Sequence, residues 1–211
     1  MKPRKPIHLV ICEGRDDQFV IEGLARDLGI QDKLEFLHFA EEKGTLRSFL
    51  VAISKSPDFA SGALRSILVT CDADDSFENR WQSVTDANNA AFGVNLAEPG
   101  KWQQVPSGPR LAAWINPGPN RPGMLETLCL EAVRENESKV FPCIDTFMSC
   151  VEDAHGSPLH EKARFYIWSI VAQGPTAQHQ LALPKALERF PPNWQSEAFS
   201  ELREVLKSAL E

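Results

Sequence analysis

Carboxylates follow two apolar runs of the sequence in the same way, and this repeated arrangement is the clearest sign of chemistry in the chain. Glu13 comes directly after the run 7–12, and Asp72 and Asp74 come after the run 66–71. Oxygen ligands with no His or Cys beside them are typical of Mg²⁺ or Mn²⁺ sites rather than of zinc sites. We therefore predict that these carboxylates hold Mg²⁺ or Mn²⁺.

A fourth carboxylate, Asp17, lies four residues after Glu13, where one turn of helix would bring it back to the same place. Two like charges about 4 Å apart repel by about 1 kcal/mol in water and by about 4 kcal/mol at an effective dielectric constant of 20. Such a cluster lowers stability unless a cation occupies it. Asp16, Asp17 and Asp75 also suit the first turn of a helix by themselves. A metal site is favoured because Glu13 and Asp72 each come directly after a predicted strand.

The elements that would position these residues alternate between strands and helices. Short apolar runs predict strands at 7–12, 34–39, 66–71 and 111–115. Helical spacing of apolar residues predicts helices at 16–28, 45–53, 78–92, 124–135, 161–172, 184–189 and 197–210. The connection 93–109 has the pattern of a short hairpin. The alternation predicts an α/β, Rossmann-like parallel sheet of about four strands with helices on both faces.

This alternation ends near residue 140, after which only helices are predicted. We therefore expect an α/β domain over residues 1–140 and a helical extension over 141–211 packed on the same core. In the common strand order 2-1-3-4, the first and third strands are neighbours. Their carboxyl ends, and the acids that follow them, would then face one another.

Composition limits the kind of protein this is. The chain has 211 residues, 43% of them hydrophobic and 24% charged, which is typical of a folded globular protein. The net charge of −7 argues against a protein that coats nucleic acid but not against a nuclease that binds metal ions. No apolar run approaches the roughly 20 residues of a membrane helix, and residues 1–6 precede no signal-peptide core. We expect a cytoplasmic protein, with its five cysteines as buried free thiols.

Three segments resemble a known family. Residues 9–17 read Leu-Val-Ile-Cys-Glu-Gly-Arg-Asp-Asp, residues 69–74 read Val-Thr-Cys-Asp-Ala-Asp, and residues 123–128 read Gly-Met-Leu-Glu-Thr-Leu. The first two resemble the TOPRIM fold shared by topoisomerases, DnaG-type primases and OLD-type nucleases. With the third, the chain is similar over most of its length to small standalone TOPRIM-like bacterial proteins.

The resemblance implies roles for particular residues. Glu13 would be a metal ligand or general acid–base, and Lys162 would steady charge in the transition state. The implied metal ligands are Glu13, Asp17, Asp72, Asp74 and Glu126. Glu126 also suits a first-turn helix acid, and Lys162 also suits a solvated helix face. A topoisomerase would need a nucleophilic tyrosine, and the one tyrosine, Tyr166, lies in an apolar helical stretch.

Three functions follow from these patterns. The first is a metal-dependent nuclease of the TOPRIM and OLD type that cuts DNA or RNA. Since the chain lacks the phosphate-binding motif Gly-x-x-x-x-Gly-Lys-[Ser/Thr], the resemblance further implies a separate ATPase as partner and a role in phage defence. The second is a receiver-like domain that accepts a phosphoryl group. The third is a catalytically silent TOPRIM-like module.

Overall fold

The computed structural model describes residues 5–39, 45–135, 140–174, 177 and 179–211. Within these residues one sheet has five strands in the order β2-β1-β3-β5-β4. The strands are β1 Ile7–Cys12, β2 Leu34–His38, β3 Leu64–Asp72, β4 Gln103–Gln104 and β5 Arg110–Asn116. All neighbours pair in parallel except β4, which pairs antiparallel with β5. The predicted α/β class and the predicted order of the four parallel strands are confirmed, and β4 lies in the connection that has the hairpin pattern.

The central strands are apolar because the sheet is covered on both faces. In β5 every residue after Arg110 is buried, and in β3 only Arg65 is exposed. The register pairs Cys12 of β1 with Thr70 of β3, and Asp72 of β3 with Asn116 of β5. The carboxyl ends of three neighbouring strands therefore lie at the same end of the sheet, which we call its carboxyl edge.

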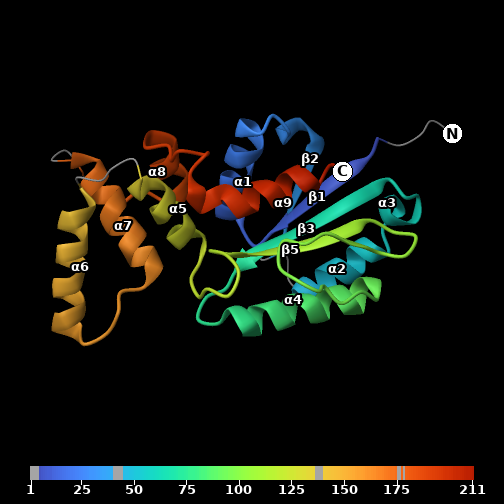
Figure 1. The fold of residues 1–211 in the computed structure, drawn as a ribbon, viewed down its shortest axis with the longest axis horizontal. Coiled ribbons are helices and arrows are strands. Elements are labelled where there is room, and N and C mark those ends of the chain that lie inside the picture. Colours follow the sequence, from blue (N-terminus) through green and yellow to red (C-terminus); the bar gives the residue numbers. More distant parts are fainter. Residues whose placement is uncertain (1–4, 40–44, 136–139, 175–176, 178) are drawn as a thin grey trace.

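Helices cover the two faces of the sheet (Figure 1). They are α1 Arg15–Asp27, α2 Leu46–Ser54, α3 Pro57–Ala60, α4 Phe77–Phe92, α5 Leu125–Arg134, α6 Phe141–His155, α7 Glu161–Ala172, α8 Leu183–Arg189 and α9 Ser200–Ser208. Short 3-10 turns span Gln31–Lys33 and Glu197–Phe199. Leu50 of α2 and Val84 of α4 pack on one face, whereas α1, α5 and α9 contribute to the apolar cluster on the other. No helix in the described part of the chain combines the length and the apolar character that crossing a lipid bilayer requires.

Helix α6 is absent from the sequence prediction. Its apolar residues Phe141, Ile144 and Met148 have helical spacing and are buried, and Gly156 ends the helix with φ 68°. This spacing is the signal that could have predicted the helix. Two cysteines expected to be buried, Cys143 and Cys150, are exposed on α6, although all five cysteines are free thiols as predicted.

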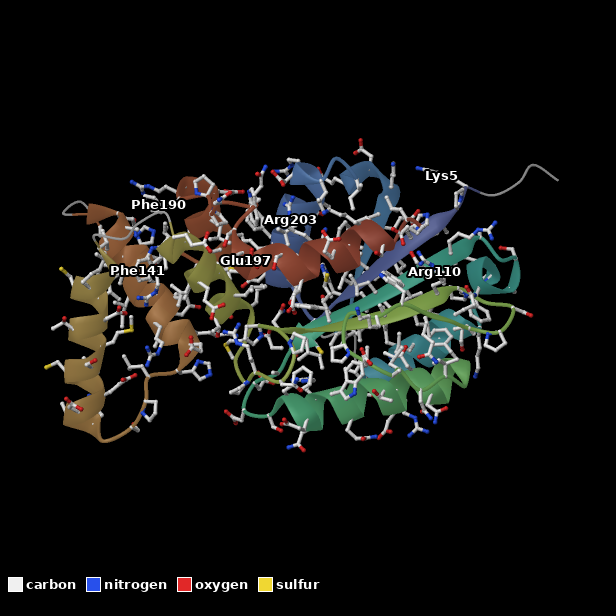
Figure 2. All side chains as sticks on the ribbon, in the orientation of Figure 1. Lys5, Arg110, Phe141, Phe190, Glu197 and Arg203 are labelled. Atoms are coloured by element: carbon white, nitrogen blue, oxygen red, sulfur yellow. The ribbon has the colours of Figure 1, made fainter. Side chains whose placement is uncertain are left out.

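Hydrogen bonds join the last helix and the residue after it to the end of the sheet where β1 and β5 begin. His8 of β1 contacts the carbonyl oxygen of Ala209 through Nδ1 (3.0 Å), and the indole N–H of Trp102 donates to the carbonyl of Val205 (3.0 Å). Arg110, on β5 beside α9 (Figure 2), donates to the carbonyl of Ser208. These three hydrogen bonds hold the end of the chain against the sheet, at the opposite end from Glu13 and Asp72.

Candidate functional site

The acids that follow β1 and β3 meet at the edge of the sheet. The backbone N–H of Asp72 donates to Oε2 of Glu13 at 3.3 Å. Since Glu13 follows β1 directly and Asp72 ends β3, the bond joins the tips of two neighbouring strands. The predicted convergence of these two residues is confirmed.

Asn116 links two of the carboxylates, and sequence reasoning missed it. Its amide Nδ2 donates to Oδ1 of Asp17 (3.2 Å) and to Oδ1 of Asp72 (3.1 Å). The indole N–H of Trp114 donates to Oδ1 of Asn116 (3.1 Å). This bond identifies the amide oxygen, so the NH₂ group of Asn116 is the one that faces the two carboxylates. The only sequence signal is its position as the last residue of the strand that pairs with β3.

Backbone N–H groups at two helix starts point at the same carboxylates. Gly14 N–H, before α1, donates to Oδ2 of Asp17 (3.1 Å), and Leu125 N–H, the first of α5, donates to Oδ1 of Asp72 (2.9 Å). Asp17 is therefore both a first-turn helix acid and a member of the cluster. Helix N-termini stabilise negative charge, so these contacts hold both carboxylates in place.

Burial changes the protonation of both residues. Burial, together with the negative charges of Asp72 and Glu13, raises the pKa of Asp17 to about 8, although the hydrogen bond from Gly14 N–H opposes the shift. Burial likewise raises the pKa of Asp72 to about 7, while the hydrogen bond from Asn116 opposes the shift and the charge of Glu126 adds to it. Each residue therefore binds a proton more tightly than an exposed Asp does, and a bound cation would compete with that proton.

Glu126 and Lys162 also lie at this edge. Glu126, on the first turn of α5, is 6% exposed, and burial raises its pKa while the positive charge of Lys162 lowers it. The pKa of Asp16 is also raised by burial and lowered by Lys162. Helix α7 thus places an exposed ammonium group close to two acids of the site.

Asp74 differs from the other predicted ligands. Asp74 does not continue the extended backbone of β3, because it has φ 51°, and its carbonyl accepts from Gly123 N–H (2.8 Å). Its side chain is 51% exposed and forms an ion pair with Arg80 of α4. The left-handed turn directs this carboxylate to Arg80.

A cleft of about 720 Å³ opens beside the cluster. We call it the α7 cleft because the segment that starts α7 forms one wall. It is lined by Asp74, Asp75, Pro122, Gly123, Met124, Pro158, Leu159, His160 and Glu161.

We call Glu13, Asp17, Asp72 and Glu126 the carboxylate cluster. Its donor chemistry fits a hard dication, because these four carboxylates are partly or fully buried and supply only oxygen. As placed, no three His, Cys, Asp or Glu side chains in the described ranges form a group that could hold a metal ion. Asn116 and Leu125 each donate a hydrogen bond to Asp72, and Arg80 donates one to Asp74. Metal binding stays a prediction.

Comparison with known proteins gives the family. The family model described as "Protein of unknown function (DUF3226)" matches residues 7–211. The chain belongs to the DUF3226 family. No curated protein matches this DUF3226 chain. Among solved structures it is similar to a hypothetical protein, PH0156 from Pyrococcus horikoshii OT3, with 16% identity and a TM-score of 0.61 over 97% of this chain and 94% of the other. That likeness is one of fold.

Proposed function

We propose that the chain is a metal-dependent phosphodiesterase that cleaves DNA or RNA, of the type that its resemblance to TOPRIM and OLD nucleases implies. One observation carries the proposal: Asp72 bonds Glu13 through its backbone and shares the amide of Asn116 with Asp17. Two carboxylates at strand ends, Glu13 and Asp72, thus lie together with Asp17 of α1, and Asp17 and Asp72 have raised pKa values. A bound cation would offset their repulsion.

The proposed ion is Mg²⁺ or Mn²⁺. Glu13, Asp17, Asp72 and Glu126 would hold it, and Asp74 would join them only after giving up its ion pair with Arg80. When bound, the ion would supply a nucleophilic water and neutralise charge on the phosphate. The assigned ligands donate only oxygen, as this class of ion prefers.

The remaining chemistry falls to side chains at the edge of the site. The oxygen of one water bonds to phosphorus, the P–O bond to the leaving nucleoside breaks, and the leaving oxygen takes up a proton. Glu13, held by the Asp72 N–H, would accept the proton of the attacking water. Lys162, which acts on the pKa of Glu126 and Asp16, would neutralise a phosphate oxygen.

A separate ATPase as partner, a role in phage defence and a cytoplasmic location belong to the same proposal. The ATPase partner and the role in phage defence are supported by the resemblance, and the partner also by the absence of a P-loop motif from the sequence. ATP-dependent stimulation of cleavage by a co-purified ATPase would be the sign of such a partner.

The test is cleavage of single-stranded DNA, linear and supercoiled duplex DNA and structured RNA in millimolar Mg²⁺ or Mn²⁺. We expect at least one of these substrates to be cut, and Asp72→Asn to lower the rate by about 100-fold or more, as loss of a group that binds a catalytic ion does. Asp86→Asn, an exposed acid on α4, is the matched control and keeps full activity. We also expect the divalent ion to raise the melting temperature, because it binds the native state preferentially.

Two results would overturn the proposal. One is the lack of cleavage of every substrate together with a melting temperature indifferent to divalent ions. The other is labelling of an aspartate by acetyl phosphate without cleavage, which would select the receiver-like alternative.

A further inference from the structure

Arg80 brings a positive charge to the carboxyl edge of the sheet. It lies near the start of α4, and its guanidinium group forms an ion pair with Asp74. Burial lowers the pKa of Arg80, but the negative charges of Cys71, Glu13 and Asp74 raise it above its ordinary value. The charge of Arg80 therefore acts on Glu13 of the carboxylate cluster as well as on Asp74.

The backbone around Asp74 is held in place, whereas its side chain is open to solvent. Gly123 N–H donates to the carbonyl of Asp74 (2.8 Å), and the preceding residue, Ala73, donates its N–H to the carbonyl of Asn116 (2.9 Å). The side chain of Asp74 is 51% exposed and lines the α7 cleft. Rotation of this side chain alone would give its carboxylate a new partner, while the end of β3 stays where it is.

The ion pair between Arg80 and Asp74 is of a kind that is easily exchanged. The two side chains are 26% and 51% exposed, and ion pairs in contact with water contribute little to stability. A divalent cation at the carboxylate cluster would attract the charge of Asp74 and repel that of Arg80. The presence of the ion therefore favours separation of the pair.

A separated Arg80 suits the phosphate of a substrate. The guanidinium group presents its donors in a planar fork that matches two phosphate oxygens. The carboxylate cluster by itself repels a phosphodiester, so the substrate needs positive groups at this edge. Lys162 of α7, whose charge acts on Glu126, is one such group, and Arg80 of α4 is a second.

We propose that Arg80 exchanges partners when substrate binds: it holds Asp74 in the metal-free protein, and it binds the phosphate of the phosphodiester after Asp74 has turned to the metal ion. This proposal rests on the proposed phosphodiesterase function and adds an order of binding to it. The ion binds first, and its binding makes Arg80 available to the substrate.

Two substitutions break the same ion pair and separate this exchange from a structural role. The measurement is the Kd of Mn²⁺ without substrate, by isothermal titration calorimetry. We expect Arg80→Gln to lower this Kd by about two- to fivefold, the range that an exposed ion pair accounts for, because Asp74 then has no competing partner. We expect Asp74→Asn to raise it by about tenfold or more, since loss of a residue that merely orients a metal ligand already costs about 10–100-fold in affinity. An ion pair with only a structural role would shift both values in the same direction.

The second measurement is kcat/KM at saturating Mn²⁺, for the nucleic acid that the wild type cleaves fastest in the cleavage assay. We expect Arg80→Gln to lower it by about tenfold or more, as loss of a hydrogen bond to a charged group does. Arg80→Lys keeps the charge without the fork of donors, so its Kd for Mn²⁺ should stay within about twofold of the wild type and its kcat/KM should be intermediate. Arg65→Gln, at an exposed residue near the start of β3, is the control and changes neither value.

A Kd for Mn²⁺ that rises or stays the same in Arg80→Gln, or an unchanged kcat/KM in that variant, would overturn the exchange and leave the nuclease function standing. If the wild type cleaves none of the nucleic acids with either ion, the proposed function fails and this proposal fails with it.

Discussion

Asp17 is the residue whose protonation the fold controls most strongly. It is 6% exposed, and burial beside Asp72 and Glu13 raises its pKa to about 8, above the value of about 3.9 in an unfolded chain. The folded state therefore binds the proton more tightly than the unfolded state. This stabilising contribution is fully present below about pH 4 and is lost as pH rises to about 8.

Replacing Asp17 by Asn should flatten this pH dependence, because the amide does not ionise. In EDTA, we expect the free energy of unfolding of the wild type to fall between pH 5 and pH 8, and Asp17→Asn to lessen that fall by about 1–4 kcal/mol, at about 1.4 kcal/mol per pKa unit. Urea unfolding at a series of pH values measures it. Asp75→Asn, at an exposed acid, should keep the wild-type slope. Parallel profiles for the wild type and Asp17→Asn would contradict the raised pKa.

The charged residues of the candidate site could be predicted from the sequence. Glu13 and Asp72 stand out because each follows an apolar strand. Asn116 does not stand out, because it is a neutral amide at the end of a strand, and only the register with β3 shows its role. The left-handed backbone of Asp74 was equally hidden, since Asp adopts that conformation only where surrounding contacts favour it.

At the scale of elements, the loop between β5 and α5 connects the site to the α7 cleft. Gly123 in this loop has φ 125°, where L side chains are strained, and its N–H donates to the carbonyl of Asp74 (2.8 Å). A Cβ there would lie 2.9 Å from Oγ1 of Thr127 and 3.3 Å from the ring of Pro117. Thr127 Oγ1 in turn accepts the N–H of Met124 at the start of α5 (3.3 Å).

We expect Gly123→Ala to lower the free energy of unfolding by about 1–3 kcal/mol, the usual cost of a strained backbone conformation, and to reduce phosphodiesterase activity by disturbing the start of α5. Gly156→Ala is the control. Gly156 has φ 68°, and nothing lies within 4 Å of the added Cβ, so only the left-handed backbone cost of about 1 kcal/mol applies and activity is kept. Urea unfolding and the cleavage assay measure both. Equal losses of activity in the two variants would show that the loop does not position the site.

The elements themselves follow largely from apolar periodicity. The four parallel strands and the helices that cross between them were predictable because each buries one face or both against the sheet. Helix α6 was not predicted, since its signal is short: Phe141, Ile144 and Met148 are buried, while much of its remaining length is exposed. Asp16 and Lys162 are far apart along the chain, so the sequence did not predict the electrostatic interaction between them that the packing of α7 creates.

On the scale of the whole molecule, one apolar cluster joins the sheet to the C-terminal helices. Val10 of β1, Leu128 of α5, Trp168 of α7 and Leu206 of α9 all belong to it. Arg203 of α9, which Figure 2 labels, also donates to Asp27 of α1 and to the carbonyl of Trp194. Because no separate core is needed for the helices after α5, the extension predicted over 141–211 is expected to unfold together with the sheet.

Unfolding in one transition is testable with a single core substitution. Leu206 is fully buried on α9, and Leu206→Ala is expected to lower the free energy of unfolding by about 2–5 kcal/mol. If the core is shared, the midpoint measured by far-UV circular dichroism and the midpoint measured by tryptophan fluorescence shift together in urea. Lys207→Ala, at an exposed neighbour on the same helix, leaves the free energy of unfolding from both signals within about 0.5 kcal/mol of the wild type. Two separate transitions, with Leu206→Ala moving only one of them, would show instead that the helical extension is an independent domain.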